Sequence, residues 1–264
     1  MKALNKMKAV AIIPARMESS RFPGKPLASI HGMPMIGHCY IRTNMCLDLI
    51  DTYVATCNQE IADYIESIGG KAIMTSDSHE RASDRTAEAM LKIEGLLGYK
   101  IDTVVMVQGD EPMTTPEMIS KSLEPLLQDD DVNVVNLMSD IEFDSEFEDP
   151  NEVKVVVDNN NDALYFSREP IPSKKKGETY GPMQKQVCII PFRRDFLLMF
   201  NDMHETVLEK IESIDMLRVM ENGYKVRMIY SDTKSFSVDT QQDLDNVIIE
   251  MKNDLLMKTY LKCR

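Results

Sequence analysis

The chain has 264 residues and a formal net charge of -13. This acidic balance argues against a nucleic-acid backbone or an anionic membrane as the main partner. Apolar runs stay short of the ~18 residues that a membrane-spanning helix needs, and residues 1–7 lack the apolar stretch of a secretory signal, so we expect a lead-in segment there. The five scattered cysteines form no CxxC pair, which favours reduced thiols in a cytoplasm over disulfides or zinc ligands.

Short apolar strands alternate with helical stretches through the first half of the chain. Strands are predicted at residues 8–13, 52–56, 71–75 and 103–107, and helices at residues 34–47, 58–68, 84–97 and 116–127. This βαβα alternation predicts an α/β fold with a doubly wound, mostly parallel sheet. Because such sheets bind ligands at the carboxyl ends of their strands, the loops after Ile13, Thr75 and Val107 are expected to share one edge.

The second half is less regular. A strand pair is predicted at residues 152–157 and 163–167, with further strands at 187–191 and 225–230, and helices at 204–222 and 240–253. Residues 129–131 and 140–149 are expected to be acidic surface segments. We predict one domain over residues 8–253, preceded by the lead-in of residues 1–7 and followed by a C-terminal tail at residues 254–264.

Residues 14–27 (PARMESSRFPGKPL) follow the first strand and gather cations and hydroxyls in one loop. The cations are Arg16, Arg21 and Lys25, and the hydroxyls belong to Ser19 and Ser20. Cations this close repel one another, and the arginine fork and the lysine point charge both suit phosphate oxygens. The loop is not a Walker A motif, because no Ser or Thr follows Lys25. A solvated basic loop is the alternative, but a cationic cluster in so acidic a chain favours a triphosphate site.

Two acidic motifs are candidates for a metal site. The apolar strand at residues 103–107 ends directly in QGDEP, which places Asp110 at the carboxyl edge of the sheet. Mg²⁺ prefers one or two carboxylates together with phosphate oxygens, so Asp110 suits a metal beside a triphosphate, although a simple polar turn is the alternative. In SVDT (residues 237–240), Asp239 or Thr240 is by default a helix N-cap.

Five motifs together carry a resemblance to a known family: residues 14–27, QGDEP, DPNEVK (149–154), ALYFSR (163–168) and SVDT. In order and spacing, residues 8–251 resemble the CMP-Kdo synthetases, the 3-deoxy-manno-octulosonate cytidylyltransferases. The resemblance implies a fold of the nucleotide-diphospho-sugar transferase type, with an antiparallel extension for dimerisation and sugar binding. It also implies a cytoplasmic homodimer that couples CTP to an acidic sugar and releases pyrophosphate, as a step of lipopolysaccharide biosynthesis.

The resemblance also implies roles for individual residues. The implied catalytic residues are Arg16, Lys25 and Asp110. The implied nucleotide-binding residues are Ala15, Arg16, Ser19, Ser20, Arg21, Lys25 and Ser83. The implied sugar-binding residues are Arg85, Gln108, Arg168, Gln186 and Asp215. The implied ligands of Mg²⁺ are Asp110 and Asp239.

The chain departs from the family pattern at positions that the resemblance assigns to the sugar pocket. A family histidine is replaced by Gln186, a tyrosine by Ile190, and a Glu-Gln pair reads Asp215-Met216. A glutamine does not titrate as a histidine does, and methionine offers almost no hydrogen bonding. Two explanations stay open: neutral drift within a Kdo enzyme, or a modified acid sugar such as a deoxy or amino variant.

Two rival functions are also considered. The first is a cytidylyltransferase for a different acid, such as another ulosonic acid or a phosphonate. The second is a nucleotide-binding protein that has lost catalysis. The joint presence of Arg16, Lys25, Asp110 and Asp239 argues against the second rival.

Overall fold

Four parallel strands form the sheet of the first of two units into which the chain divides. The computed structural model describes residues 7–18, 21–176, 181 and 183–261. Unit 1 comprises residues 1–120 and 235–264, and unit 2 comprises residues 121–234. The strands of unit 1 are β1 (Ala9–Ala15), β4 (Asp51–Thr56), β5 (Ala72–Met74) and β6 (Thr103–Val107). They lie in the order β6-β1-β4-β5, all parallel, which confirms the predicted parallel sheet.

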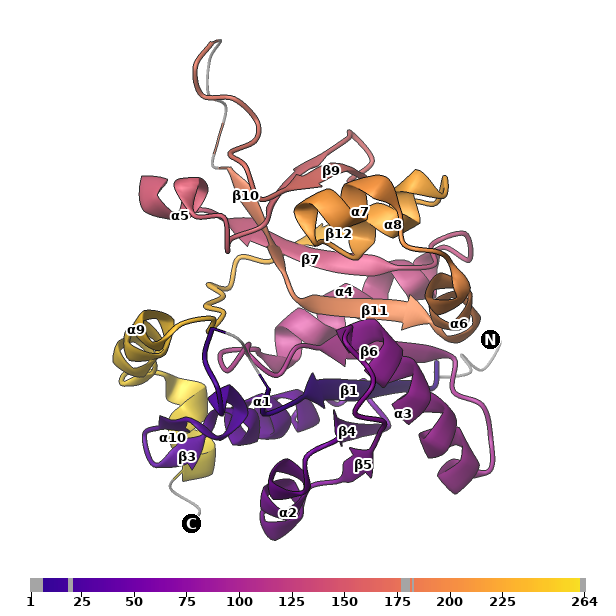
Figure 1. Ribbon diagram of the computed structural model, residues 1–264, viewed down its shortest axis with the longest axis vertical. Coiled ribbons are helices and arrows are strands. Elements are labelled where there is room, and N and C mark those ends of the chain that lie inside the picture. Colours follow the sequence, from indigo (N-terminus) through magenta and orange to yellow (C-terminus); the bar gives the residue numbers. More distant parts are fainter. Residues whose placement is uncertain (1–6, 19–20, 177–180, 182, 262–264) are drawn as a thin grey trace, which may run out of the picture. The chain divides into compact units, whose positions relative to one another are not determined.

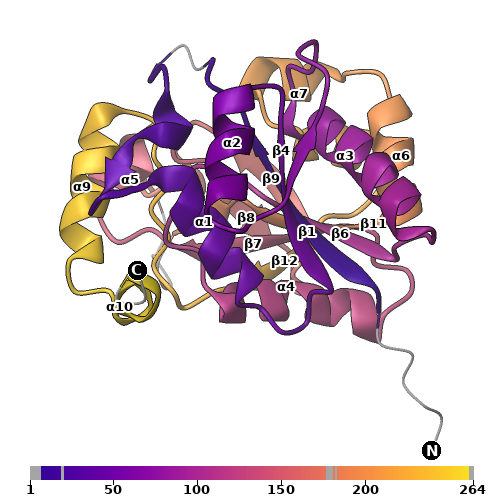
Figure 2. The same ribbon diagram turned by 90° about the horizontal axis from the view of Figure 1, so that it is seen from below.

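Helices cover both faces of this sheet. They are α1 (Met35–Asn44), α2 (Gln59–Ser67), α3 (Ala82–Leu97) and the start of α4 (Pro116–Gln128). Figure 1 shows them around the strands, and Figure 2 shows α1 and α2 on one side of β1 and β4 with α3 on the other. The apolar face of α2 buries Ile61, Ala62 and Ile65, as helical spacing predicts. No helix among the described residues is long and apolar enough to cross a membrane.

The connection from β1 to α1 contains short elements, and the end of the chain contains two helices. The 3-10 turn η1 (Lys25–Leu27) precedes a two-stranded hairpin of β2 (Ser29–Ile30) and β3 (Met33–Pro34). The chain returns to unit 1 with α9 (Gln241–Met251) and α10 (Leu255–Leu261). Within the predicted tail, α10 is fixed at its start by Asp254, which accepts a hydrogen bond from the buried Arg42 at 3.0 Å.

Unit 2 is built on a mostly antiparallel sheet. Its strands are β7 (Val135–Asp140), β8 (Lys154–Val157), β9 (Ala163–Ser167), β10 (Gln184–Val187) and β12 (Arg227–Tyr230), in the order β12-β7-β10-β8-β9. Only β12 and β7 pair in parallel. The remaining elements are β11 (Ile189–Arg193), α5 (Asp144–Glu148), α6 (Arg194–Asp202), α7 (Val207–Glu212) and α8 (Met216–Glu221). The predicted hairpin of β8 and β9 is confirmed.

Two predictions for unit 2 are wrong. The single helix at residues 204–222 is broken into α7 and α8, because Ser213 adopts a left-handed conformation with φ 54. The single strand at residues 187–191 is divided between β10 and β11. The acidic surface segment predicted at residues 140–149 has its Glu142, Asp144 and Glu148 exposed, and it also contains α5, whose Phe147 is buried.

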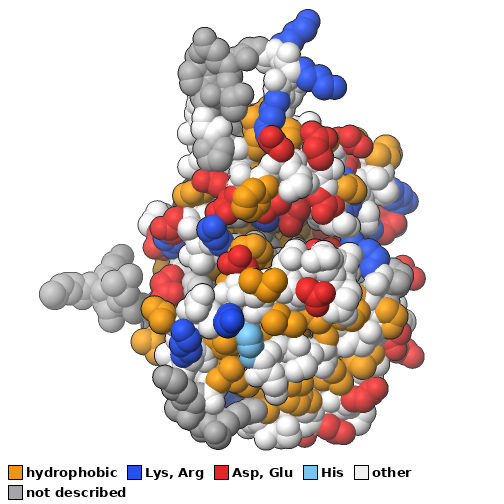
Figure 3. Space-filling model, turned by 90° about the vertical axis from the view of Figure 1, so that its left-hand side faces the viewer, with side chains coloured by type: hydrophobic (Ala, Val, Ile, Leu, Met, Phe, Trp, Pro, Cys, Tyr) orange, Lys and Arg blue, Asp and Glu red, His pale blue; other side chains and the backbone are white. Residues whose placement is uncertain are grey.

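Acidic side chains are spread over the surface rather than confined to the predicted segments. On the face drawn in Figure 3, Asp and Glu side chains are interspersed with Lys and Arg side chains. Several of these charges form surface ion pairs, such as Lys121–Asp232 and Lys234–Glu142. Exposed pairs of this kind contribute little to stability, roughly 0–1 kcal/mol each. The stability of both units therefore depends mainly on their buried apolar cores.

His38 joins α1 to α10 inside unit 1. Its ring is fully buried and stacks edge-on against Tyr260, with the centroids 5.7 Å apart. The Nε2–H donates to the carbonyl of Ile30 at 2.9 Å, because a carbonyl can only accept, and Nδ1 accepts from the Tyr260 hydroxyl at 2.7 Å. This arrangement requires a neutral imidazole. Burial is the main cause that lowers the pKa of His38 to about 4.

We therefore predict that His38 makes unit 1 sensitive to acid. The pKa of the imidazole is about 6.5 in the unfolded chain, so the unfolded state binds the proton more tightly. The contribution of neutral His38 to the free energy of unfolding is complete above pH 6.5 and is lost as the pH falls towards 4. This one group should lower the free energy of unfolding by about 2 kcal/mol between pH 7 and pH 5. Denaturant unfolding at pH 7 and pH 5 measures this loss. Between the two pH values, His38→Asn should lose about 2 kcal/mol less unfolding free energy than the wild type.

The matched control is Tyr260→Phe. It removes the hydroxyl but keeps the ring that buries His38, so the wild-type pH dependence should persist. Equal pH dependence of the wild type and His38→Asn would contradict the assignment.

Candidate functional site

The loops that follow β1, β5 and β6 line one cavity of unit 1, with a volume of about 300 Å³. Residues 14–16, 79–82 and 108–110 contribute its walls, together with residues from the η1 turn and from the segment before α9. The carboxyl ends of parallel strands meet at one edge of a sheet. The predicted common edge for the loops after Ile13, Thr75 and Val107 is therefore confirmed.

Most of the residues assigned to this end of the molecule line that cavity. They are Ala15, Arg16, Arg21, Lys25, Arg85, Gln108, Asp110 and Asp239. Ser83 is fully buried at the start of α3 and is absent from the lining. Ser19 and Ser20 lie outside the described residues. The structure thus brings together the predicted cations and carboxylates, while their individual roles stay predictions.

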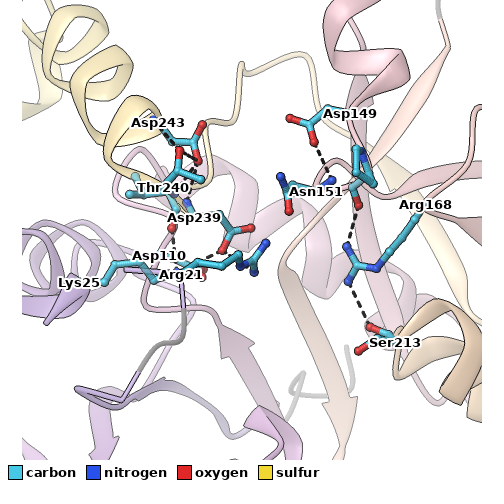
Figure 4. A network of polar contacts seen from close by, with 12 residues as sticks. Arg21, Lys25, Asp110, Asp149, Asn151, Arg168, Ser213, Asp239, Thr240 and Asp243 are labelled. Carbon is cyan, nitrogen blue, oxygen red and sulfur yellow. Dashed lines mark hydrogen bonds and ion pairs between the residues drawn. The ribbon is translucent and has the colours of Figure 1, made fainter. Parts of the chain in front are cut away.

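The centre of the site is the ammonium group of Lys25, which joins two carboxylates (Figure 4). Lys25 Nζ donates to Asp110 Oδ2 at 2.8 Å and to the carbonyl of Val238 at 2.7 Å, and lies 3.4 Å from Asp239 Oδ1. Arg21 Nη2 reaches the same oxygen of Asp239 at 2.9 Å. Burial by itself lowers the pKa of Lys25, but Asp110 and then Asp239 outweigh it and raise the pKa above its ordinary value. The ammonium therefore stays charged.

Local backbone geometry presents Lys25 to the carboxylates. Gly24 adopts φ 75, a left-handed conformation that glycine tolerates best. Its amide donates to the carbonyl of Met17 at 3.0 Å, which closes the loop on itself. The η1 turn begins directly after it, with Pro26 in its first turn, where a missing N–H has no cost.

The two carboxylates are held by turns at the end of β6 and before α9. The amide of Val238 donates to the carbonyl of Asp110 at 3.0 Å, so these turns are tied together. Thr240 is the N-cap of α9 in a capping box with Asp243. The default interpretation of Thr240 as an N-cap is confirmed. Asp239 is left to accept the ion pairs of Lys25 and Arg21.

The third wall of the cavity is shaped around Arg85. This guanidinium is 2 % exposed and donates to Thr75 Oγ1 at 2.6 Å and to the carbonyls of Ser76 at 3.1 Å and His79 at 3.3 Å. Arg16 Nη1 approaches the same His79 carbonyl at 3.5 Å. Arg85 therefore fixes the loop after β5, in addition to facing the cavity.

Glu88, on α3, holds this loop from the other side. It accepts the Ser76 amide at 3.0 Å and contacts the His79 ring. Burial raises the pKa of Glu88, but the hydrogen bonds from Lys92, Ser76 and His79 outweigh it and lower the pKa to about 2. Glu88 is therefore ionised at neutral pH.

Several lining residues were missed from the sequence. They are Glu18, His79, Glu80 and Arg81. Glu18 lies within the loop of residues 14–27, and His79, Glu80 and Arg81 lie shortly before the predicted Ser83 and Arg85, so adjacency was the available signal. Their side chains match no motif that specifies chemistry, which is why only their neighbours were selected.

The cavity offers two carboxylates to a metal ion. Asp110 and Asp239 converge on the same ammonium nitrogen. Among the described residues, no group of three or more His, Cys, Asp or Glu side chains could hold a metal by itself. Mg²⁺ is commonly bound by one or two carboxylates, with phosphate oxygens and water completing its shell. The donor set therefore fits Mg²⁺ that is shared with a phosphorylated ligand.

In unit 2, Arg168 is held by backbone carbonyls (Figure 4). Its Nε donates to the carbonyl of Glu212 at 2.6 Å, Nη1 to Pro150 at 2.8 Å and Nη2 to Ser213 at 3.3 Å. The Glu212 carboxylate accepts the amide of Arg168 at 2.8 Å and the hydroxyl of Ser167 at 3.1 Å. Arg168 thus connects the end of β9 to the break between α7 and α8.

The other unit 2 residues assigned to the sugar occupy different surroundings. Gln186, on β10, donates its amide N–H to Asn136 Oδ1, and Asp215 precedes α8 as its N-cap residue. The apolar replacements Ile190 and Met216 are 3 % and 1 % exposed. They are core residues of unit 2, so these departures from the family pattern are accommodated by apolar packing.

Comparison with known proteins places these features in context. A family model described as cytidylyltransferase matches residues 10–231. The 3-deoxy-manno-octulosonate cytidylyltransferase of Geobacter metallireducens is 42% identical over 252 residues, which cover 92% of this chain and 97% of that protein. The enzyme of the same name from Acaryochloris marina is 36% identical, with 90% and 95% covered.

Solved structures give the same result as the sequence comparisons. A CMP:2-keto-3-deoxy-manno-octonic acid synthetase complexed with CTP matches with a TM-score of 0.85 and 38% identity, covering 94% of this chain and 100% of that one. A 4-diphosphocytidyl-2C-methyl-D-erythritol synthase from Anaerococcus prevotii has a TM-score of 0.64 at 13% identity, which is a likeness of fold alone.

The close approach of the QGDEP turn to β1 predicts that a side chain at Gly109 would be crowded. A Cβ at this position would lie 3.0 Å from the carbonyl of Pro14 and 3.2 Å from Ile36 Cδ1. Gly109→Ala should therefore displace the turn that carries Asp110 and lower the free energy of unfolding by about 1–3 kcal/mol. Denaturant unfolding measures this loss.

The matched control is Gly95→Ala in α3, where a Cβ meets nothing within 4 Å. In a helix this exchange should stabilise the protein by up to about 1 kcal/mol. If Gly109→Ala were as stable as Gly95→Ala, the close approach would not constrain the turn.

Proposed function

The chain belongs to the cytidylyltransferase family, and on that premise we propose that it couples CTP to 3-deoxy-manno-octulosonate or a close relative of this acid. The products are the CMP-sugar and pyrophosphate. We propose residues 8–253 as one nucleotidyltransferase domain that comprises both units. We also propose that the enzyme acts in the cytoplasm as a homodimer.

One observation carries this proposal above the others. Cations and carboxylates gather in one cavity at the carboxyl edge of a parallel sheet, and its lining includes Arg16, Arg21 and Lys25 together with Asp110 and Asp239. A triphosphate with a divalent metal carries both kinds of charge that such a lining complements. A protein that has only to bind a nucleotide does not need the carboxylate pair close to the phosphate-binding cations.

The proposed reaction is an in-line attack of a sugar hydroxyl on the α-phosphorus of CTP. A bond forms between the sugar oxygen and this phosphorus, the hydroxyl proton is released to solvent, and the bond to the bridging oxygen of pyrophosphate breaks. Positioning and charge neutralisation contribute most to transfers of this kind. Arg16 and Lys25 would bind the β- and γ-phosphates and offset the charge on the departing pyrophosphate. Arg21 would assist from the same loop.

We propose that Asp110 and Asp239 hold Mg²⁺ when CTP is bound. The metal supplies a positive charge that polarises phosphoryl oxygens. Lys25 now donates to both carboxylates, so it must exchange these partners for phosphate oxygens. Asp110 and Asp239 would therefore pair with the Lys25 ammonium when no nucleotide is bound, and would bind the metal when CTP is bound.

For the sugar, we propose Arg85 and Gln108 in unit 1 and Arg168, Gln186 and Asp215 in unit 2. Support comes from the match to the CMP-Kdo synthetases along nearly the whole chain. Ile190 and Met216 are buried and offer no hydrogen-bonding group. The polar contacts that the family makes at those two positions are therefore absent from this chain.

The function is tested by pyrophosphate release from CTP with a panel of acids. We expect Kdo or a close deoxy or amino relative to be the best acceptor, and replacing CTP by ATP, GTP or UTP should abolish release. Asp110→Ala should reduce kcat/KM by at least about a hundredfold, as loss of a charge-stabilising group at a reacting phosphate does. Activity with Kdo far below that with an unrelated acid would overturn the Kdo assignment, and unchanged turnover of Asp110→Ala would overturn the metal assignment.

The Lys25 contacts predict weak metal binding in the absence of nucleotide. Because the ammonium already pairs with both carboxylates, Lys25→Met should lower the dissociation constant for Mn²⁺ by about tenfold or more, equivalent to roughly 1.4 kcal/mol. Electron paramagnetic resonance of free Mn²⁺ measures this without CTP or turnover.

Two further variants make this result interpretable. Lys100→Met, at an exposed position, should leave Mn²⁺ binding unchanged. The double variant Lys25→Met/Asp110→Asn should lose the gain in Mn²⁺ affinity that Lys25→Met produces. An unaltered Mn²⁺ affinity of Lys25→Met would show that the ammonium does not compete with the metal.

A further inference from the structure

Asn58 stands at the end of β4, directly before α2, in the position of a helix N-cap. Asparagine is among the best N-cap residues because its side chain can accept an amide of the first turn, a contribution of about 1 kcal/mol. Here the side chain makes no such bond to α2. Its polar atoms are turned instead towards the phosphate-binding loop that follows β1.

The contacts to that loop use both ends of the amide. Asn58 Oδ1 accepts the backbone N–H of Met17 at 2.9 Å, and Nδ2 donates to Glu18 Oε1 at 3.3 Å. The amide orientation follows from these partners, because a backbone N–H can only donate and a carboxylate can only accept. Two consecutive loop residues are thereby tied to the N-cap position of α2, two residues beyond β4.

From Met17 the constraint continues to the reacting end of the site. The carbonyl of Met17 accepts the amide of Gly24 at 3.0 Å, and Gly24 is the left-handed residue that begins the η1 turn. Lys25 is the next residue, and its ammonium reaches Asp110. A single residue, Met17, thus links Asn58 to the η1 turn: its N–H donates to Asn58 and its carbonyl accepts from Gly24. That turn presents the phosphate-binding cation Lys25.

We propose that Asn58 is a positioning residue that pre-forms the triphosphate loop through Met17 and Gly24. This inference rests on the proposed use of CTP, and it assigns to the end of β4 a function that neither the motifs nor the family match assign. Without this contact, the loop would have to be ordered by the nucleotide itself. Binding energy would then be spent on ordering the loop, and affinity for CTP would fall.

The expected signature is a rise in KM for CTP with little change in kcat. Loss of one hydrogen-bonded contact of this kind corresponds to a KM increase of about tenfold in Asn58→Ala, with kcat within about threefold, because the bound nucleotide restores the loop. A merely structural effect has the opposite pattern, since global destabilisation lowers the active fraction and hence kcat. Asn44→Ala, at an exposed position on α1, is the matched control and should leave both constants unchanged.

A charge exchange tests the specific pairing. Asn58→Asp keeps the acceptor for Met17 but places two carboxylates in contact, so KM for CTP should rise. Adding Glu18→Gln restores the hydrogen bond with its direction reversed, because the new amide at position 18 donates to the new carboxylate at position 58. KM for CTP should then return to within about threefold of the wild-type value. Adding Glu80→Gln instead removes the same charge from the same cavity without the pairing, and should not restore KM.

Hydrogen exchange of the Met17 amide reports on the contact without turnover. Protection should be lost in Asn58→Ala and kept in Asn44→Ala. An unchanged KM or an unchanged Met17 exchange rate in Asn58→Ala would overturn the proposal, as would equal rescue by Glu80→Gln. Absence of CTP-dependent pyrophosphate release from the wild type would instead overturn the proposed function.

Discussion

The site depends on one partly buried ammonium group, that of Lys25. Lys25 meets Asp110 and Asp239 although 85 and 214 positions separate them in sequence. Two partly buried carboxylates this close repel each other, and the repulsion is stronger in a protein than in water. The cation between them therefore helps to hold the end of β6 and the segment before α9 against the loop after β1. The same charges are suited to a metal–triphosphate ligand.

The sequence was sufficient for the parallel half of the fold because its signals are local. Each strand of unit 1 is an apolar run followed by an amphipathic helix, and parallel strands place their following loops at one edge. Asp110 could be assigned to that edge from its position after β6. The contact of Lys25 with Asp110 could not be predicted, because no local pattern specifies a side-chain partner far away in the chain.

In unit 2 the errors have a common origin, since long-range contacts determine where elements begin and end. Residues 204–222 have continuous helical character, yet Ser213 takes a left-handed conformation. Across the break, the buried Arg218 donates to the buried Glu209 at 2.8 Å and packs on the ring of Phe200. A buried charge needs its partner, so this pair fixes α7 against α8. The pattern of charges in the sequence showed the two residues but not their pairing.

The two arginines predicted to bind the sugar have further contacts that their motifs do not indicate. Arg85 and Arg168 each donate to two or more backbone carbonyls. A guanidinium has five N–H groups in a fixed plane, and three of those in Arg168 are directed at carbonyl oxygens. Each arginine therefore shapes a loop, whatever charge it offers to a ligand. Replacing either one would remove both contributions, so a loss of activity alone would not identify a carboxylate-binding residue.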